Sequence, residues 1–109
     1  MSARDAFTAI ADPTRREILE LLRDRGTLMA GEIAANFASA SRPGISRHLR
    51  VLKECGVVSA ERDGQAQIYR LDPRPLARIR DEWLASFAVA QVESLRALRR
   101  RVEGPKRRS

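Results

Sequence analysis

The spacing of apolar residues predicts that the first half of the chain is helical. Apolar side chains recur three or four positions apart there, which places them on one face of a helix. In residues 41–55, for example, Ile45, Leu49 and Leu52 form a single stripe that is expected to be buried. Helices are predicted over residues 5–11, 13–25, 30–37 and 41–55.

Residues suited to helix ends flank two of these segments. Asp12 and Ser41 precede the second and fourth helices, and their side chains can accept hydrogen bonds from the free N–H groups of a first turn. Pro13 fits a first helical position. Gly26 and Gly56 are expected to end the same two helices.

Two strand-like segments and one long helix follow. Residues 57–62 and 66–71 flank Asp63-Gly64, a pair typical of the tight turn in a β-hairpin. A last helix is predicted from Pro73 to about Val102, with Gly104-Pro105 ending it. The expected fold class is mainly α with a small β-hairpin.

The last helix carries an apolar face along most of its length. About 28 residues at 1.5 Å each give a helix of roughly 40 Å, which is longer than so small a domain can cover. An uncovered face of that size favours a second copy of the chain as partner. The residues predicted to make the dimer are Phe7, Leu76, Ile79, Trp83, Leu84, Phe87, Leu95 and Leu98.

The charge of the chain is concentrated at two places. The chain has 21 Lys and Arg against 14 Asp and Glu among 109 residues, a net charge of +7. Residues 96–109 contribute seven basic residues and one acid, so much of the excess lies near the end of the sequence. Residues 41–53 contain four basic residues and no acid. We expect one domain over residues 1–103 and a basic, disordered tail over residues 104–109.

A helix, a short turn, a second helix and a hairpin make a winged helix-turn-helix, whose second helix enters the DNA major groove. The fourth helix carries the required chemistry, because arginine can hydrogen-bond guanine and the helix N-terminus favours phosphate. Predicted base contacts are Arg42, Ser46, Arg47 and His48, with Pro43 on the same face. Predicted phosphate or minor-groove contacts are Arg50, Lys53, Arg62 and Gln65.

Several function classes are not expected. Cys55 is the single cysteine and His48 the single histidine, so one chain can form neither an internal disulfide nor a metal site of clustered Cys and His ligands. The chain has no glycine-rich phosphate loop and no evident nucleophile–base pair, so we expect no enzyme and no cofactor. No apolar run approaches the roughly 20 residues that span a membrane, and the chain is expected to be cytoplasmic.

Three segments resemble the ArsR-type winged-helix repressors. Residues 11–19, Ala-Asp-Pro-Thr-Arg-Arg-Glu-Ile-Leu, are similar to that family's opening motif. Residues 41–53 are similar to its recognition helix, and residues 56–58 to the step into its wing. The resemblance covers about residues 5–100. It implies a homodimeric bacterial transcription factor that binds a palindromic operator and represses a promoter by excluding RNA polymerase.

The sequence departs from the metal-sensing members of this family. Those members carry a cysteine pair in the helix before the recognition helix, and residues 30–37 contain no cysteine. Other members place Asp and His ligands on the last helix, where this chain has acids but no histidine. The metal-independent branch is therefore the closer match. Of its two aromatic positions on the last helix, Trp83 fills one and Gln91 stands at the other.

Two alternatives remain open at this point. The domain could dock on a protein, with the basic helix face incidental, or it could sense a metal or a thiol oxidant through ligands from both subunits. Cys55 is expected to be a small packed residue. The sequence does not indicate the operator, the regulated genes or a small-molecule effector.

Overall fold

The computed structural model describes residues 5–107, with side chains as far as residue 102. The described residues are mainly helical and contain one small sheet, which confirms the predicted fold class. The elements, in chain order, are α1 (Ala6–Ile10), α2 (Pro13–Arg25), β1 (Leu28–Met29), α3 (Ala30–Ala35), α4 (Arg42–Glu54), β2 (Val58–Asp63), β3 (Ala66–Leu71) and α5 (Arg74–Arg107).

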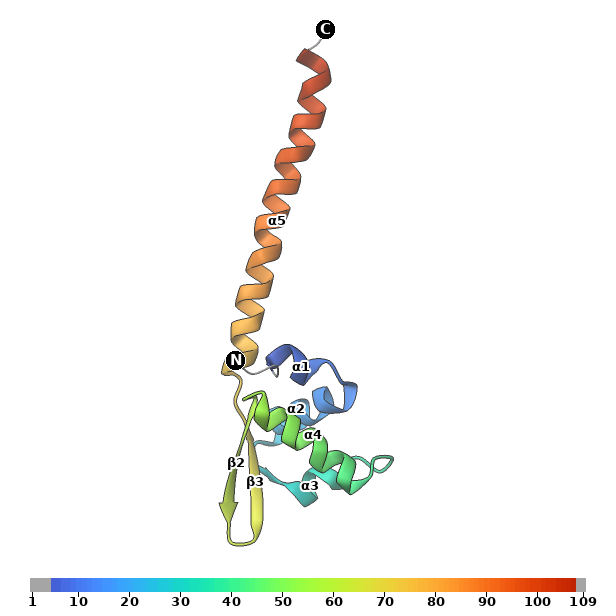
Figure 1. The fold of residues 1–109 in the computed structure, drawn as a ribbon, viewed down its shortest axis with the longest axis vertical. Coiled ribbons are helices and arrows are strands. Elements are labelled where there is room, and N and C mark those ends of the chain that lie inside the picture. Colours follow the sequence, from blue (N-terminus) through green and yellow to red (C-terminus); the bar gives the residue numbers. More distant parts are fainter. Residues whose placement is uncertain (1–4, 108–109) are drawn as a thin grey trace. The chain divides into compact units, whose positions relative to one another are not determined.

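The chain divides into two compact units, one through Ala77 and one from Arg78 onward. In the first unit, α2 contacts α1 and α4, while α3 contacts α4 and the sheet. The β2–β3 hairpin extends beyond these helices, as Figure 1 shows in light green and yellow. We call this hairpin the wing. The second unit is the rest of α5.

The sheet has three antiparallel strands in the order β1-β3-β2, among the described residues. The sequence predicted only the two strands of the hairpin, so β1 was missed. Leu28 pairs with Tyr69 and Met29 with Ile68. A strand of two residues carries no alternating pattern, and this one exists because β3 supplies its hydrogen-bonding partner.

The turn of the wing lies one residue later than predicted. Asp63 pairs with Ala66 as the last residue of β2, so Gly64 and Gln65 form the loop instead of Asp63 and Gly64. Gly64 has φ +64°, and no non-glycine residue in the described chain has a positive φ. A positive φ at the first loop position alone is the type II′ arrangement, which favours glycine there.

The core of the first unit joins α2, α3, α4 and the base of the wing. Its side chains are aliphatic, as expected for a chain with few aromatic residues, and the stripe predicted on the fourth helix is part of it. The largest fully buried side chains among the described residues are Ile18, Leu22, Ile33, Ile45, Leu49, Leu52 and Val57.

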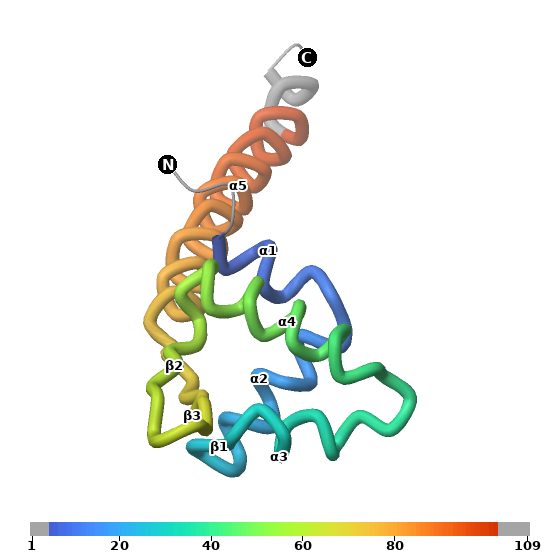
Figure 2. The backbone as a smooth tube through the Cα atoms, turned by 60° about the horizontal axis from the view of Figure 1, so that its bottom comes forward, coloured from blue at the N-terminus to red at the C-terminus, as the bar shows by residue number. Residues whose placement is uncertain are grey.

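Helices α2 and α4 begin as the sequence predicts. Asp12 accepts a hydrogen bond from the backbone N–H of Arg15 at 3.1 Å, and Ser41 accepts one from that of Gly44 at 3.1 Å. The predicted third helix is two residues shorter than expected, and residues 36–41 form the loop that leads into α4 (Figure 2).

Helix α5 continues past its predicted end. It reaches Arg107, so Gly104-Pro105 does not terminate it. A proline inside a helix removes one backbone hydrogen bond. Because only two residues of the helix follow Pro105, this loss costs little helix stability here. Of the predicted basic tail, residues 108–109 and the side chains of 104–107 lie outside the described residues. None of the helices, over the residues searched, is long and apolar enough to cross a membrane.

Candidate nucleic-acid interface

Helix α4 has one buried face and one exposed basic face. Ile45, Leu49 and Leu52 are each at most 1 % exposed, which fixes the rotation of the helix against the core. The opposite face is open to solvent, and it contains most of the side chains that the sequence predicted for DNA contact. The exposed members are Arg42, Pro43, Ser46, Arg47, Arg50 and Lys53.

The beginning of α4 is a second part of this surface. Ser41 caps the helix, and Pro43 occupies its first turn. The N–H groups of a first helical turn carry partial positive charge and can bind a phosphate. Arg42 adds a full charge at the same end.

The side chain of Arg42 lies against α3. A Cβ on Gly31 would stand 3.2 Å from Nη2 of Arg42, so the glycine leaves room for the guanidinium. Arg42 also borders a groove of about 590 Å³ that is shared with the wing, where Gln65 and Gln67 line it. The structure therefore brings the predicted contacts Arg42 and Gln65 to one groove.

The wing presents the other two predicted contacts near its tip. Arg62 lies on β2 opposite Gln67, and Gln65 lies in the two-residue loop. Both side chains are exposed. The tip combines Arg62 with Asp63, so it has little net charge of its own.

His48 differs from the other predicted contacts, because its ring is directed at the beginning of α2. Its Nδ1 lies 3.3 Å from Nη1 of Arg15, and its Nε2 lies 3.8 Å from a carboxylate oxygen of Asp12. The side chain is 25 % exposed. Its contact with a base stays a prediction, and Arg15 and Asp12 are functional candidates that sequence reasoning missed.

The same neighbours act on the Asp12 carboxyl. Partial burial raises its pKa, but the hydrogen bond from the Arg15 backbone and the charges of His48 and Arg15 together hold the pKa below its ordinary value. Asp12 therefore stays ionised at neutral pH.

Helix α5 exposes five of its seven apolar residues that were predicted for dimerisation. Trp83 and Phe87 are 53 % and 54 % exposed, and their rings pack edge to face with centroids 5.0 Å apart. We call the exposed large apolar residues of this helix the α5 apolar face. It comprises Trp83, Leu84, Phe87, Val89, Val92, Leu95, Leu98 and Val102.

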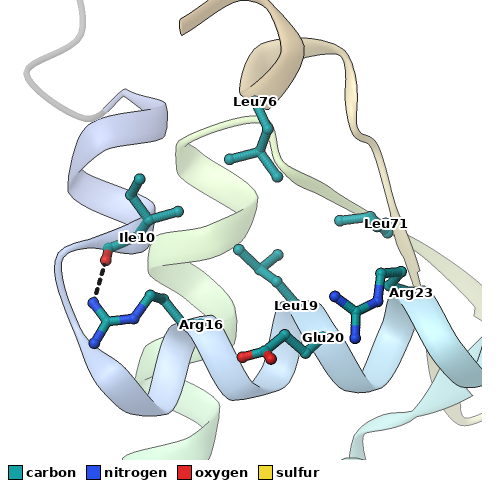
Figure 3. A pocket seen from close by; sticks show the side chains of 7 residues that line it. All are labelled: Ile10, Arg16, Leu19, Glu20, Arg23, Leu71 and Leu76. Carbon is teal, nitrogen blue, oxygen red and sulfur yellow. Dashed lines mark hydrogen bonds between the residues drawn. The ribbon is translucent and has the colours of Figure 1, made fainter. Parts of the chain in front are cut away.

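Three further predicted dimer residues are placed differently. Phe7 on α1 is 43 % exposed, whereas Leu76 and Ile79 are half-buried. Leu76 lines an apolar hollow of about 260 Å³ together with Ile10, Leu19 and Leu71 (Figure 3). Charged side chains of α2 border the same hollow. They are Arg16, Glu20 and Arg23.

Comparison with known proteins decides the family. The sequence pattern described as "bacterial regulatory protein, arsR family" matches residues 12–60. The transcriptional repressor SdpR of Bacillus subtilis is 43 % identical over 76 % of this chain and 89 % of its own length. The chain belongs to the ArsR family. An HTH-type transcriptional regulator of Mycobacterium tuberculosis is also 43 % identical to it, over 71 % of this chain and 70 % of that protein.

Solved structures of transcriptional regulators share the fold. The crystal structure of a possible transcriptional regulator for arsenical resistance has a TM-score of 0.68 and 42 % identity, covering 85 % of this chain and 94 % of that one. An ArsR family transcriptional regulator has a TM-score of 0.69 and 28 % identity, covering 78 % of this chain and 84 % of that one.

Membership of the ArsR family confirms the predicted DNA-binding transcriptional repressor with a winged helix-turn-helix. Proteins of this family are regulators that bind double-stranded DNA and not enzymes. Within the described residues, no group of three or more His, Cys, Asp or Glu side chains could hold a metal ion. Cys55 is buried at the end of α4.

Replacing Ser41 separates helix capping from charge at the start of α4. Ser41→Ala removes the acceptor for the Gly44 N–H and should lower the free energy of unfolding by about 1 kcal/mol. Ser41→Asp keeps an acceptor, so its stability in urea denaturation should stay near that of the wild type, while its negative charge should weaken DNA binding. Ser39→Ala, in the preceding loop, is the matched control. Equal stability of Ser41→Ala and the control would show that the cap contributes nothing.

Proposed function

We propose that this ArsR-family protein is a homodimeric repressor whose two α4 helices enter the major groove at the two halves of a palindromic operator. One observation carries the proposal: α4 buries its aliphatic stripe and exposes four basic residues to solvent against a single acid, Glu54, at its last position. A DNA major groove is wide enough to admit such a helix. We place its action on cytoplasmic DNA.

The exposed side chains of α4 divide into two groups by their position along the helix. Arg42, Ser46 and Arg47 lie toward the beginning of α4, the part that contacts base edges in helix-turn-helix proteins. We assign these three residues to base contacts. Arg50 and Lys53 lie further along the helix, and we assign them to phosphate contacts. Pro43, in the first turn of α4, is assigned to packing against the DNA backbone.

The wing extends the interface. Because Arg42 and Gln65 border the same groove, DNA bound at the start of α4 lies within reach of the wing tip. We assign Arg62 and Gln65 to phosphate or minor-groove contacts. Because their net charge is weak, the wing contributes more to the orientation of the protein on DNA than to the strength of binding.

The α5 apolar face supports the homodimer. Apolar side chains this exposed over several helical turns are unfavourable in water, and a second copy offers an identical apolar face. A two-fold dimer would present two α4 helices to half-sites about one DNA turn, roughly 34 Å, or a multiple of it apart. Phe7 is a further candidate contact.

Repression by occlusion of a promoter is the mechanism we propose. SdpR, which resembles this chain over most of its own length, is named a transcriptional repressor. A bound dimer would exclude RNA polymerase from an overlapping promoter. The absence of cysteine from α3 and of histidine from α5 supports control without a metal.

Arg47→Ala tests base recognition by α4. The change should cost about 1–3 kcal/mol at a DNA sequence selected by the wild-type protein, and less on random DNA, because a base contact is lost along with a charge. Gel shifts or fluorescence anisotropy at fixed salt measure both affinities. Arg80→Ala is the control, since Arg80 is an exposed arginine on α5 that pairs with Asp81. An equal loss on both DNAs would refute a base contact. Only weak, sequence-independent binding by the wild type would favour a protein-docking domain instead.

Trp83→Ala tests the dimer. Removing a large aromatic side chain from the centre of an interface commonly costs about 2 kcal/mol or more, which corresponds to roughly 30-fold weaker association. Sedimentation velocity over a range of protein concentrations should show this shift. Glu82→Ala, its polar neighbour on the helix, should leave association nearly unchanged. A wild-type protein that sediments as a monomer at micromolar concentration would contradict the proposal.

A further inference from the structure

Arg15 connects three helices of the first unit through one guanidinium group. Its Nη2 donates to the carbonyl of Thr8 at 2.9 Å and its Nε donates to the carbonyl of Ala9 at 3.1 Å, both on α1. Its Nη1 lies 3.3 Å from Nδ1 of His48 on α4. Arg15 itself belongs to α2, so the side chain joins α1 and α4 across it.

The protons in this cluster can be assigned by chemistry. A guanidinium group only donates hydrogen bonds, so Nδ1 of His48 must accept, and a neutral ring then carries its proton on Nε2. Nε2 lies 3.8 Å from a carboxylate oxygen of Asp12, the N-cap of α2, and this oxygen accepts the backbone N–H of Arg15. Arg15 is therefore the close partner of the ring, and the Asp12 carboxylate lies beside its other nitrogen.

The place of His48 in α4 gives this cluster its effect. Successive residues on an α-helix are about 100° apart, so His48 lies between the exposed Arg47 and the buried Leu49 around the helix. The buried stripe sets which face of α4 is exposed, and a side chain held at this boundary limits the small rotations that this packing still allows. Recognition of a base needs its contacts placed within about 0.5 Å, which buried aliphatic packing alone does not guarantee.

We propose that Arg15 is a positioning residue for DNA recognition, which acts through His48 to hold α4 in the orientation that presents Arg47 to the bases. This inference rests on the proposed role of α4. It assigns Arg15 no contact with DNA, and it gives His48 a role in orienting the helix.

Arg16 supplies a matched control on the same helix. Its Nη1 donates to the carbonyl of Ile10 at 2.7 Å, so it also ties α2 to α1, as Figure 3 shows. Within the described part of the chain, Arg16 forms no hydrogen bond or ion pair with α4. Arg15→Lys and Arg16→Lys each keep the positive charge and replace a planar fork by a compact ammonium group that cannot span several acceptors.

The experiment compares the two variants by their specificity ratio, the affinity for a DNA sequence selected by the wild-type protein divided by that for a scrambled sequence of equal length. Arg15→Lys should lower this ratio about five- to tenfold, chiefly through weaker binding to the selected sequence. Arg16→Lys should keep the wild-type ratio, although both variants lose a tie to α1. Urea denaturation confirms that each variant is folded under the conditions of binding.

His48 variants test the route from Arg15 to α4. If Arg15 acts through His48, the ratio falls in His48→Ala, and adding Arg15→Lys to that variant lowers it no further. His48→Asn keeps an acceptor oxygen near the position of Nδ1 and should recover much of the ratio lost in His48→Ala. A base contact made by His48 itself would instead make the two losses add.

Three outcomes would overturn the proposal. They are an unchanged ratio in Arg15→Lys, an equal fall in Arg16→Lys, and additive losses in the double variant. Arg47→Ala, measured beside them, separates this failure from that of the proposed function. If Arg47→Ala also leaves the ratio unchanged, α4 does not read bases, and both proposals are wrong. If only the Arg15 variants leave the ratio unchanged, the positioning role alone is wrong.

Discussion

The burial of three aliphatic side chains in α4 constrains the rest of the DNA-binding surface. Ile45, Leu49 and Leu52 are almost wholly removed from water, and each contributes roughly 1.5–3 kcal/mol by that transfer. Turning the helix would expose this stripe and bury arginines without partners, which costs far more than any surface contact returns. The exposed basic face is thus a consequence of the core. Its polar residues are free to serve recognition because they contribute little to folding.

Several hydrogen bonds connect the helices that surround this core. Asp12 and Ser41 begin α2 and α4, while Arg15 and Arg16 hold the carbonyls at the end of α1. These contacts use donors and acceptors that a helix end leaves unsatisfied. Arg15 also connects α1, which exposes Phe7, to His48 on α4, the helix that we propose enters the major groove. The same short segment therefore joins the helices of the domain and, in our proposal, orients its interface.

The sequence predicts much of this architecture because its strongest patterns are local. The aliphatic stripe of α4, the caps at Asp12 and Ser41, and the two strands of the wing all depend on residues a few positions apart. The missed features depend on contacts between distant residues. Strand β1 is formed by pairing with β3, and the ring of His48 is drawn to Arg15, 33 residues earlier. The turn of the wing was misplaced by one residue because Asp63-Gly64 and Gly64-Gln65 both contain the required glycine.

The central claim is that two α4 helices read the major groove at two half-sites. Methylation protection at guanine N7 tests it most directly, because this atom lies in the major groove where an arginine of α4 would bind. On a DNA fragment selected by the protein, we predict two patches of protection about one helical turn, roughly 34 Å, or a whole multiple of it apart. Protection should disappear from both patches in Arg47→Ala. Binding that leaves every guanine N7 open to methylation, or that protects a single patch, would contradict the account.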